Sequence, residues 1–286
     1  MARKISEKFI KEFTENSLKP VLEYVKSDDT LAMELRGKEV MIYYRGGMIL
    51  AIKEESYEFT GLSVGYGEIE KPSLTTFENY FPKAKHLIDF YTKNTWEKDI
   101  QQRIVQENNY SPNSKGTDYF IIDTEYECNT GRFDFVALRW DSTTPARRLQ
   151  KGYKTGITIF EVKQGVDSLT GDSGIKGHYH KFEDFIANRP NVDNFISDMV
   201  DVFQQKRCLG LVIDIDILKS LTKADVMPDI EFVFLLTNYN SDSKKLSNEL
   251  ENIGDCEFIC ANPMGYGLYE RNIISKHEFL KRFSTP

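Results

Sequence analysis

Two short stretches of the chain place charged side chains inside rows of apolar residues. In GRFDFVAL, residues 131–138, Asp134 stands between two phenylalanines. The run GITIFEVKQG, which begins at residue 156, carries Glu161-Val162-Lys163. A buried charge is costly unless it is paired or coordinates a metal. These charged residues are therefore either structural ion pairs or the chemical site of the protein.

Their spacing predicts that the charged side chains meet at one edge of a sheet. Side chains at positions i and i+2 of a strand point the same way, so Glu161 and Lys163 continue one apolar row and Asp134 continues another. Two converging carboxylates repel each other unless a cation lies between them. Hard oxygen ligands favour Mg²⁺ or Mn²⁺ over zinc. Such an ion binds phosphate and activates water, and Lys163 could orient that water, so these residues indicate phosphodiester hydrolysis.

Hydrophobic periodicity predicts the elements that must position these residues. Residues 1–80 predict a small N-terminal α+β region, with an opening helix and a meander of strands, whose role is unknown. Residues 83–109 predict one long helix with Trp96, Ile100 and Ile104 on its inward side. Three strands follow, the first two joined by the turn CNTG, and then helix, strand, helix and strand. The order predicts an α/β domain over residues 81–286, with a mixed β-sheet flanked by helices.

Composition and charge limit the classes of function. There is no run of 18 apolar residues and no apolar core of a secretory signal at the N-terminus, so we expect a cytoplasmic protein with no membrane partner. The net charge of −7 disfavours nucleic acid as a partner only mildly, because phosphate binding depends on local Lys and Arg. Such a basic stretch connects the two charged strands. The four cysteines are too scattered for a zinc site and are expected to be buried free thiols in a reducing compartment.

An Asp on the second of three strands, followed by an apolar strand that ends in Glu161-x-Lys163, resembles the PD-(D/E)XK nuclease superfamily. The resemblance covers about residues 83–262 and implies a restriction-endonuclease-like αβββαβ core. It implies a metal-dependent nuclease, with DNA as the expected substrate and restriction, defence or repair as its setting. A homodimer is compatible with this function, because duplex cutters often pair two sites.

The resemblance also implies a role for each matching position. Asp134 and Glu161 would be metal ligands, the backbone carbonyl of Val162 would be a further ligand, and Lys163 would be the catalytic lysine. Mg²⁺, or Mn²⁺ in its place, would be the cofactor. The only other Asp/Glu-x-Lys triplet, residues 242–244, lies in a polar loop, so only this one ends an apolar strand.

Further positions are matched less closely. Many members carry a glutamate on the first helix, and Glu97 is the expected metal ligand there, with Glu107 as its rival. Gln164 is similar to a glutamine that some members use near the scissile phosphate. The chain departs from the family in having no proline before Asp134 and no evident Q-x-x-x-Y motif in its second helical region, so we expect cutting within the strand.

Basic side chains are expected to contact the substrate backbone: Arg132, Arg147, Arg148 and Lys151. Such contacts give affinity without sequence choice. Arg132 could instead form a salt bridge with Glu125 or Glu127. His178 and His180, in KGHYHKF, could contact nucleic acid, relay a proton or bind a metal, or they could be surface residues.

The alternative interpretation assigns the same charges to stability. Lys163 would then form a partly buried ion pair with Glu161 or Asp134. The protein would be a non-catalytic nucleic-acid- or protein-binding module that retains the nuclease fold.

Overall fold

The structure is a computed structural model. Its chain divides into two compact units. Unit 1 comprises Met1–Pro112 and Asp198–Ile215, and unit 2 comprises Asn113–Ser197 and Asp216–Pro286. Residues 80 and 81, between which the sequence places a domain boundary, both lie in unit 1. The described residues are 2–62, 69–91, 96–139, 141–149, 152–165, 167–212, 220–238, 244–251, 253–261 and 265–281.

The strands of unit 1 form an antiparallel sheet in the order β1-β2-β3-β4, which confirms the predicted meander. Their bounds are β1 (Leu31–Leu35), β2 (Glu39–Tyr44), β3 (Gly47–Lys53) and β4 (Phe59–Thr60). Arg45 and Gly46 join β2 to β3 with positive φ angles of 50° and 73°. Two such residues make the type I′ turn, whose twist matches that of the flanking strands. A Cβ on Gly46 would lie 2.5 Å from Lys98 Cβ, so only glycine fits there.

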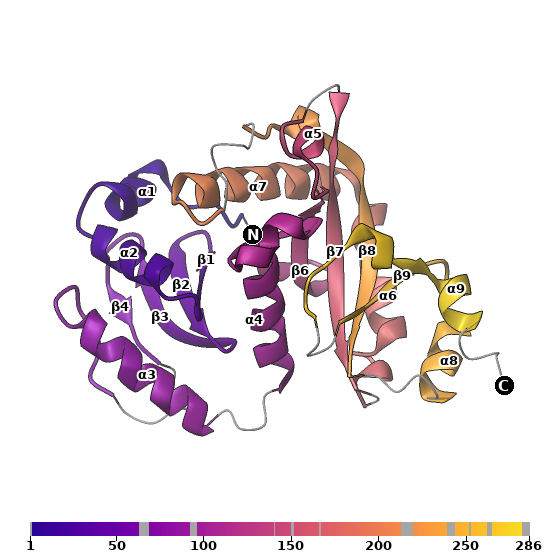
Figure 1. Ribbon diagram of the computed structural model, residues 1–286, viewed down its shortest axis with the longest axis horizontal. Coiled ribbons are helices and arrows are strands. Elements are labelled where there is room, and N and C mark those ends of the chain that lie inside the picture. Colours follow the sequence, from indigo (N-terminus) through magenta and orange to yellow (C-terminus); the bar gives the residue numbers. More distant parts are fainter. Residues whose placement is uncertain are drawn as a thin grey trace. The chain divides into compact units, whose positions relative to one another are not determined.

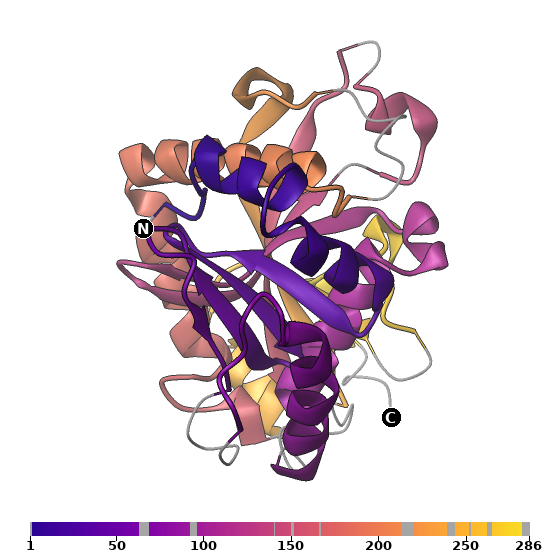
Figure 2. The same cartoon turned by 90° about the vertical axis from the view of Figure 1, so that its left-hand side faces the viewer.

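Helices pack around this small sheet (Figure 2). They are α1 (Glu7–Thr14), α2 (Lys19–Ser27), α3 (Phe77–Tyr91), α4 (Trp96–Asn109) and the part of α7 (Arg189–Cys208) that begins at Asp198. The prediction of one helix over residues 83–109 is wrong, because α3 and α4 are separate. Residues 92–95, which stand between them in the chain, lie outside the described residues. Ile100 and Ile104 are buried as predicted.

Unit 2 contains a mixed sheet in the order β10-β9-β8-β7-β6-β5 (Figure 1). Its strands are β5 (Tyr119–Cys128), β6 (Gly131–Arg139), β7 (Thr155–Gln164), β8 (Val226–Thr237), β9 (Glu257–Ala261) and β10 (Ile274–Ser275). The first three are antiparallel, whereas β7, β8 and β9 run parallel. Strand β7 is buried along its whole length except at Gln164, as expected for a central strand with parallel pairing. The prediction of a mixed α/β sheet is confirmed.

Helix α6 (Ile175–Ala187) covers this sheet through aromatic contacts. Phe182 stacks on Phe232 of β8 with ring centroids 4.5 Å apart, and Phe185 meets Phe133 of β6 edge to face at 5.4 Å. The remaining helices of unit 2 are α5 (Thr144–Arg147), the part of α7 up to Ser197, α8 (Lys244–Glu251) and α9 (Lys276–Lys281). These aromatic contacts hold α6 against strands β6 and β8.

Two further expectations concern the membrane and the cysteines. Within the part of the chain that the structure describes, no helix combines the length and the apolar character needed to cross a membrane. All four cysteines are free thiols, as predicted, but the predicted burial is wrong for three of them: Cys128 and Cys260 are half-buried and Cys208 is exposed. Cys256 is buried, and this burial raises the pKa of its thiol to about 12.

Candidate metal and catalytic site

The end of β7 holds a buried ion pair. Glu161 and Lys163 are only 2% and 4% exposed, and Lys163 Nζ donates to Glu161 Oε1 at 2.8 Å. The ammonium also donates to the backbone carbonyl of Ser173 at 2.9 Å, in the segment that leads into α6. The contact between residues two positions apart confirms the prediction that both side chains share one face of the strand.

The carboxylate of Asp134 bonds to the same segment of β7. Pairing between β6 and β7 ends at Phe135 and Phe160, and the backbone N–H of Val162 donates instead to Asp134 Oδ2 at 2.8 Å. The N–H and C=O of one residue in an extended strand point to the same side, so the Val162 carbonyl also faces β6. Asp134 is half-buried. The aspartate between two phenylalanines thus extends the strand pairing with its side chain.

His178, in the first turn of α6, adds a second nitrogen beside Glu161. Its Nδ1 lies 2.8 Å from Glu161 Oε1, and its side chain is 13% exposed. The amino-terminal end of a helix carries a partial positive charge that favours nearby anions. His180 points elsewhere, since its side chain is half-exposed and its Nδ1 lies 2.9 Å from Glu183 Oε2. The structure therefore brings His178, and not His180, to the charged segment of β7.

The glutamates expected on the first helix belong to unit 1. Both Glu97 and Glu107 lie on α4; Glu97 is exposed and Glu107 is half-buried. Gln164 is the last residue of β7 and is half-buried. Because neighbouring residues of a strand point to opposite faces, Gln164 projects away from the face that carries Glu161 and Lys163.

The basic residues that were expected to bind substrate differ in their exposure and in their partners. Arg132 is exposed and its guanidinium lies 3.7 Å from Glu125 Oε1, which confirms one of the two salt bridges considered for it. Arg147 donates to the backbone carbonyls of Thr117 at 2.8 Å, Asp141 at 3.3 Å and Ser114 at 3.5 Å. Its guanidinium therefore holds the chain around α5. Arg148 is exposed, and Lys151 lies outside the described residues.

The basic loop that contains Arg147 and Arg148 lies at the opposite end of β7 from Glu161. Helix α5 and its neighbours precede Thr155, the first residue of β7 (Figure 1). At about 3.3 Å per residue, the six steps from Thr155 to Glu161 span about 20 Å. Any phosphate that Arg148 contacts is thus remote from the carboxylates.

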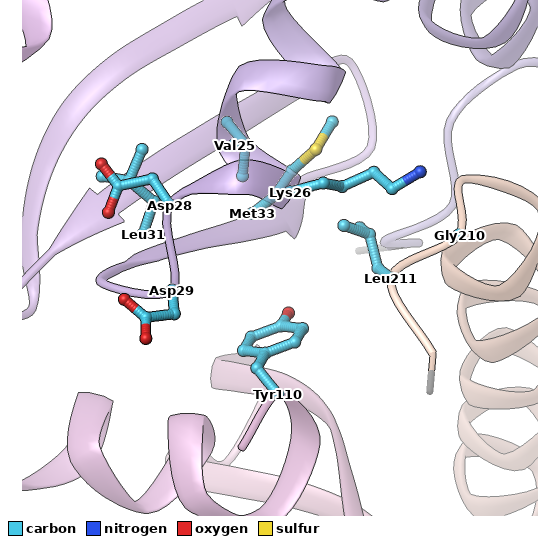
Figure 3. A pocket seen from close by; sticks show the side chains of 9 residues that line it. All are labelled: Val25, Lys26, Asp28, Asp29, Leu31, Met33, Tyr110, Gly210 and Leu211. Atoms are coloured by element: carbon cyan, nitrogen blue, oxygen red, sulfur yellow. The ribbon is translucent and has the colours of Figure 1, made fainter. Parts of the chain in front are cut away.

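A cavity of about 180 Å³ lies in unit 1, among α2, β1 and the residues that follow α4 and α7. Apolar side chains of Val25, Leu31, Met33 and Leu211 form much of its wall. The hydroxyl of Tyr110 points into it (Figure 3). Burial raises the pKa of Tyr110, and the charge of Glu34 raises it further. None of the predicted site residues lines this cavity, so it is distinct from the carboxylate site.

The donor set at the end of β7 suits a hard cation. Among the described residues, no group of three or more His, Cys, Asp or Glu side chains is arranged to hold a metal ion. Mg²⁺ needs fewer protein ligands, because it keeps several waters and is commonly bound by one or two carboxylates together with substrate phosphate. Asp134, Glu161 and the Val162 carbonyl are donors of that kind.

A scan of protein-family models and searches of curated proteins and of solved structures found no match to this chain. Any function proposed for it therefore depends on the residues of the site. The contact between His178 and Glu161 is the part of that site that the sequence did not single out. Its only local signals are the position of KGHYHKF shortly after β7 and the glycines at 174 and 177.

Proposed function

We propose that this protein is a metal-dependent nuclease of the PD-(D/E)XK type that hydrolyses phosphodiester bonds within DNA strands. The observation that carries the proposal is the bond from the Val162 amide to Asp134, beside the buried pair of Glu161 and Lys163. It joins the acid of the second strand to the Glu-x-Lys segment of the third. The antiparallel order β5-β6-β7, followed by helix α6 and the parallel strand β8, supports an assignment to the same restriction-endonuclease-like core.

Asp134, Glu161 and the Val162 carbonyl would hold Mg²⁺ or Mn²⁺. When bound, such an ion stabilises charge that develops on the phosphate and lowers the pKa of a coordinated water. The protein residues bind and orient the reacting groups. Asp134 is anchored by the Val162 amide, and Glu161 is anchored by Lys163, so neither carboxylate needs to reorganise when the substrate arrives.

Lys163 is suited to act on the phosphate or on the attacking water. Two of its three N–H donors bond Glu161 and Ser173, and the third would donate to a phosphate oxygen or orient the water. An ammonium shielded from solvent exerts a stronger field than an exposed one. The burial of Lys163 therefore favours stabilisation of the additional negative charge in the transition state.

Contacts with the rest of the DNA would come from exposed basic residues on unit 2. Arg132 lies two residues before Asp134 on β6 and would reach phosphates near the cleaved bond. Arg148 precedes β7, whose first residue, Thr155, lies about 20 Å along the strand from Glu161, which is about six base-pair steps of duplex DNA. Basic residues at these positions would suit non-specific contacts to a DNA backbone that runs along β7.

The site has a second candidate function, which the ion pair itself favours. Glu161 and Lys163 satisfy each other's charge, and Asp134 satisfies a backbone amide, so all three could serve stability in a non-catalytic nucleic-acid- or protein-binding module. Such a module would bind its partner equally well with and without divalent metal.

The decisive experiment compares wild type with Asp134→Asn on plasmid DNA, single-stranded DNA and RNA, with Mg²⁺, with Mn²⁺ and with chelator. The asparagine oxygen still accepts the Val162 N–H, so the fold should be kept while a metal ligand loses its charge. We expect metal-dependent cleavage of DNA by wild type. The cleavage rate of the variant should be lower by at least about 100-fold, because even residues that only orient a metal ligand contribute about 10–100-fold.

Asp193→Asn is the matched control, because Asp193 is an exposed residue of α7 in unit 2. It should cleave at the wild-type rate. Equal cleavage by wild type and Asp134→Asn would end the nuclease assignment, and DNA binding without cleavage under every condition would favour the non-catalytic module.

A further inference from the structure

His178 is held against β7 by the way α6 begins. A Cβ on Gly174 would lie 2.5 Å from the Leu169 carbonyl oxygen, and one on Gly177 would lie 2.2 Å from that of Asp172. Side chains are therefore excluded at both positions, and the chain turns tightly just before and within the first turn of the helix. The stacking of Phe182 on Phe232 then fixes the helix on the sheet. As a result, the side chain of residue 178 reaches the charged end of β7.

Two nitrogens meet the same oxygen of Glu161. Lys163 Nζ and His178 Nδ1 each lie 2.8 Å from Oε1, one from the same strand and one from the helix above it. A lysine side chain has several rotatable bonds, whereas the imidazole ring is rigid and its helix is docked by aromatic packing. The docked ring thus limits the orientation of the carboxylate in addition to the lysine. Oε1 accepts the hydrogen bond of Lys163 Nζ and has the His178 ring 2.8 Å away.

We propose that His178 is a positioning residue of this site, which orients the Glu161 carboxylate towards the divalent cation. The inference rests on the proposed metal-dependent function and adds a residue outside the Asp, Glu and Lys motif. In this role the Nδ1 edge of the ring lies against Oε1, 2.8 Å away, and limits how the carboxylate can turn. Residues that orient a metal ligand contribute about 10–100-fold to metal affinity or activity, and we expect an effect in that range.

The test measures Mn²⁺ binding by calorimetry rather than cleavage, on the full chain. We expect His178→Ala to weaken Mn²⁺ binding by about 10–100-fold. His178→Asn should restore most of the affinity, because its amide nitrogen occupies the place of Nδ1. His178→Gln places its nitrogen where Nε2 stood and should not restore it. His180→Ala is the matched control, two residues along the same helix, and should bind Mn²⁺ as wild type does.

The outcomes separate this inference from the proposed function. Wild-type affinity in His178→Ala, or equal affinities in the Asn and Gln variants, would overturn the positioning role and leave the nuclease proposal standing. Absence of Mn²⁺ binding in wild type would overturn both. Thermal melting followed by circular dichroism identifies a variant that has lost its fold. If the alanine variant unfolds, the comparison of the Asn and Gln variants still decides the question.

Discussion

The buried pair of Glu161 and Lys163 makes a quantitative prediction about stability. At 2.8 Å and an effective dielectric constant of about 20, two unit charges attract by about 6 kcal/mol, most of which offsets the loss of hydration. Replacing only Lys163 by methionine leaves a buried carboxylate, and breaking such a pair costs about 3–5 kcal/mol. Because His178 Nδ1 lies at the same oxygen, we expect the lower value, about 3 kcal/mol.

The assay is urea unfolding at pH 7 with chelator present, so that divalent metal does not contribute. A chain with two units need not unfold in one step. A Trp96→Phe background leaves Trp140, directly after β6, as the single tryptophan and makes the fluorescence signal report on unit 2. Glu161→Leu should also cost about 3 kcal/mol. The double variant should be more stable than either single variant, since an apolar pair of similar volume is often tolerated.

A loss below about 1 kcal/mol in Lys163→Met, the range of a surface salt bridge, would refute this reasoning. So would a double variant whose loss equals the sum of the two single losses, because the two charges would then not interact. This expectation also explains why Asp134→Asn, and not a substitution of Lys163, is the variant for testing activity: only the first leaves the buried pair intact.

Two further predictions concern charge and burial elsewhere in the chain. Burial alone would raise the pKa of Asp28, but hydrogen bonds from Lys85 and Thr30 outweigh it and hold the pKa below the ordinary 3.8. The pair therefore stabilises the fold above that pH and stops doing so as pH falls through the folded-state pKa. Lys85→Met should cost about 1–2 kcal/mol at pH 7 and progressively less from pH 5 to pH 3 in urea titrations. A constant difference would contradict this. With its pKa near 12, buried Cys256 should resist iodoacetamide at pH 8 until the protein unfolds, whereas exposed Cys208 should react at once. Equal labelling rates by mass spectrometry would show that Cys256 is accessible.

Much of the secondary structure of unit 2 was predictable because its signals are local. Alternating apolar residues marked β5, β6 and β7, and the CNTG turn marked the hairpin between the first two strands. The shared face of Glu161 and Lys163 followed from the two-residue period of a strand. The helix prediction over residues 83–109 failed because the apolar period of a helix does not by itself show that α3 and α4 are separate helices.

The partners of the charged side chains could not be predicted in the same way. Arg147 belongs to a basic run, yet it donates to backbone carbonyls of Thr117 and Ser114, which carry no side-chain signal in the sequence. The Lys206 ammonium is fully buried against Glu34, 172 positions away in the chain. A charge run in a sequence gives the number of charges and not the fraction that remains open to a ligand.

By itself, the sequence determined that three strands would carry an aspartate and a Glu-x-Lys segment at the ends of apolar rows, because side-chain direction along a strand depends only on position. Tertiary structure alone decided that Asp134 bonds the Val162 amide, that α6 brings His178 to Glu161, and that α4 groups with unit 1. Those outcomes depend on where strand pairing stops and on how helices dock. Both are set by contacts between residues that are distant in the chain, and no local pattern contains them.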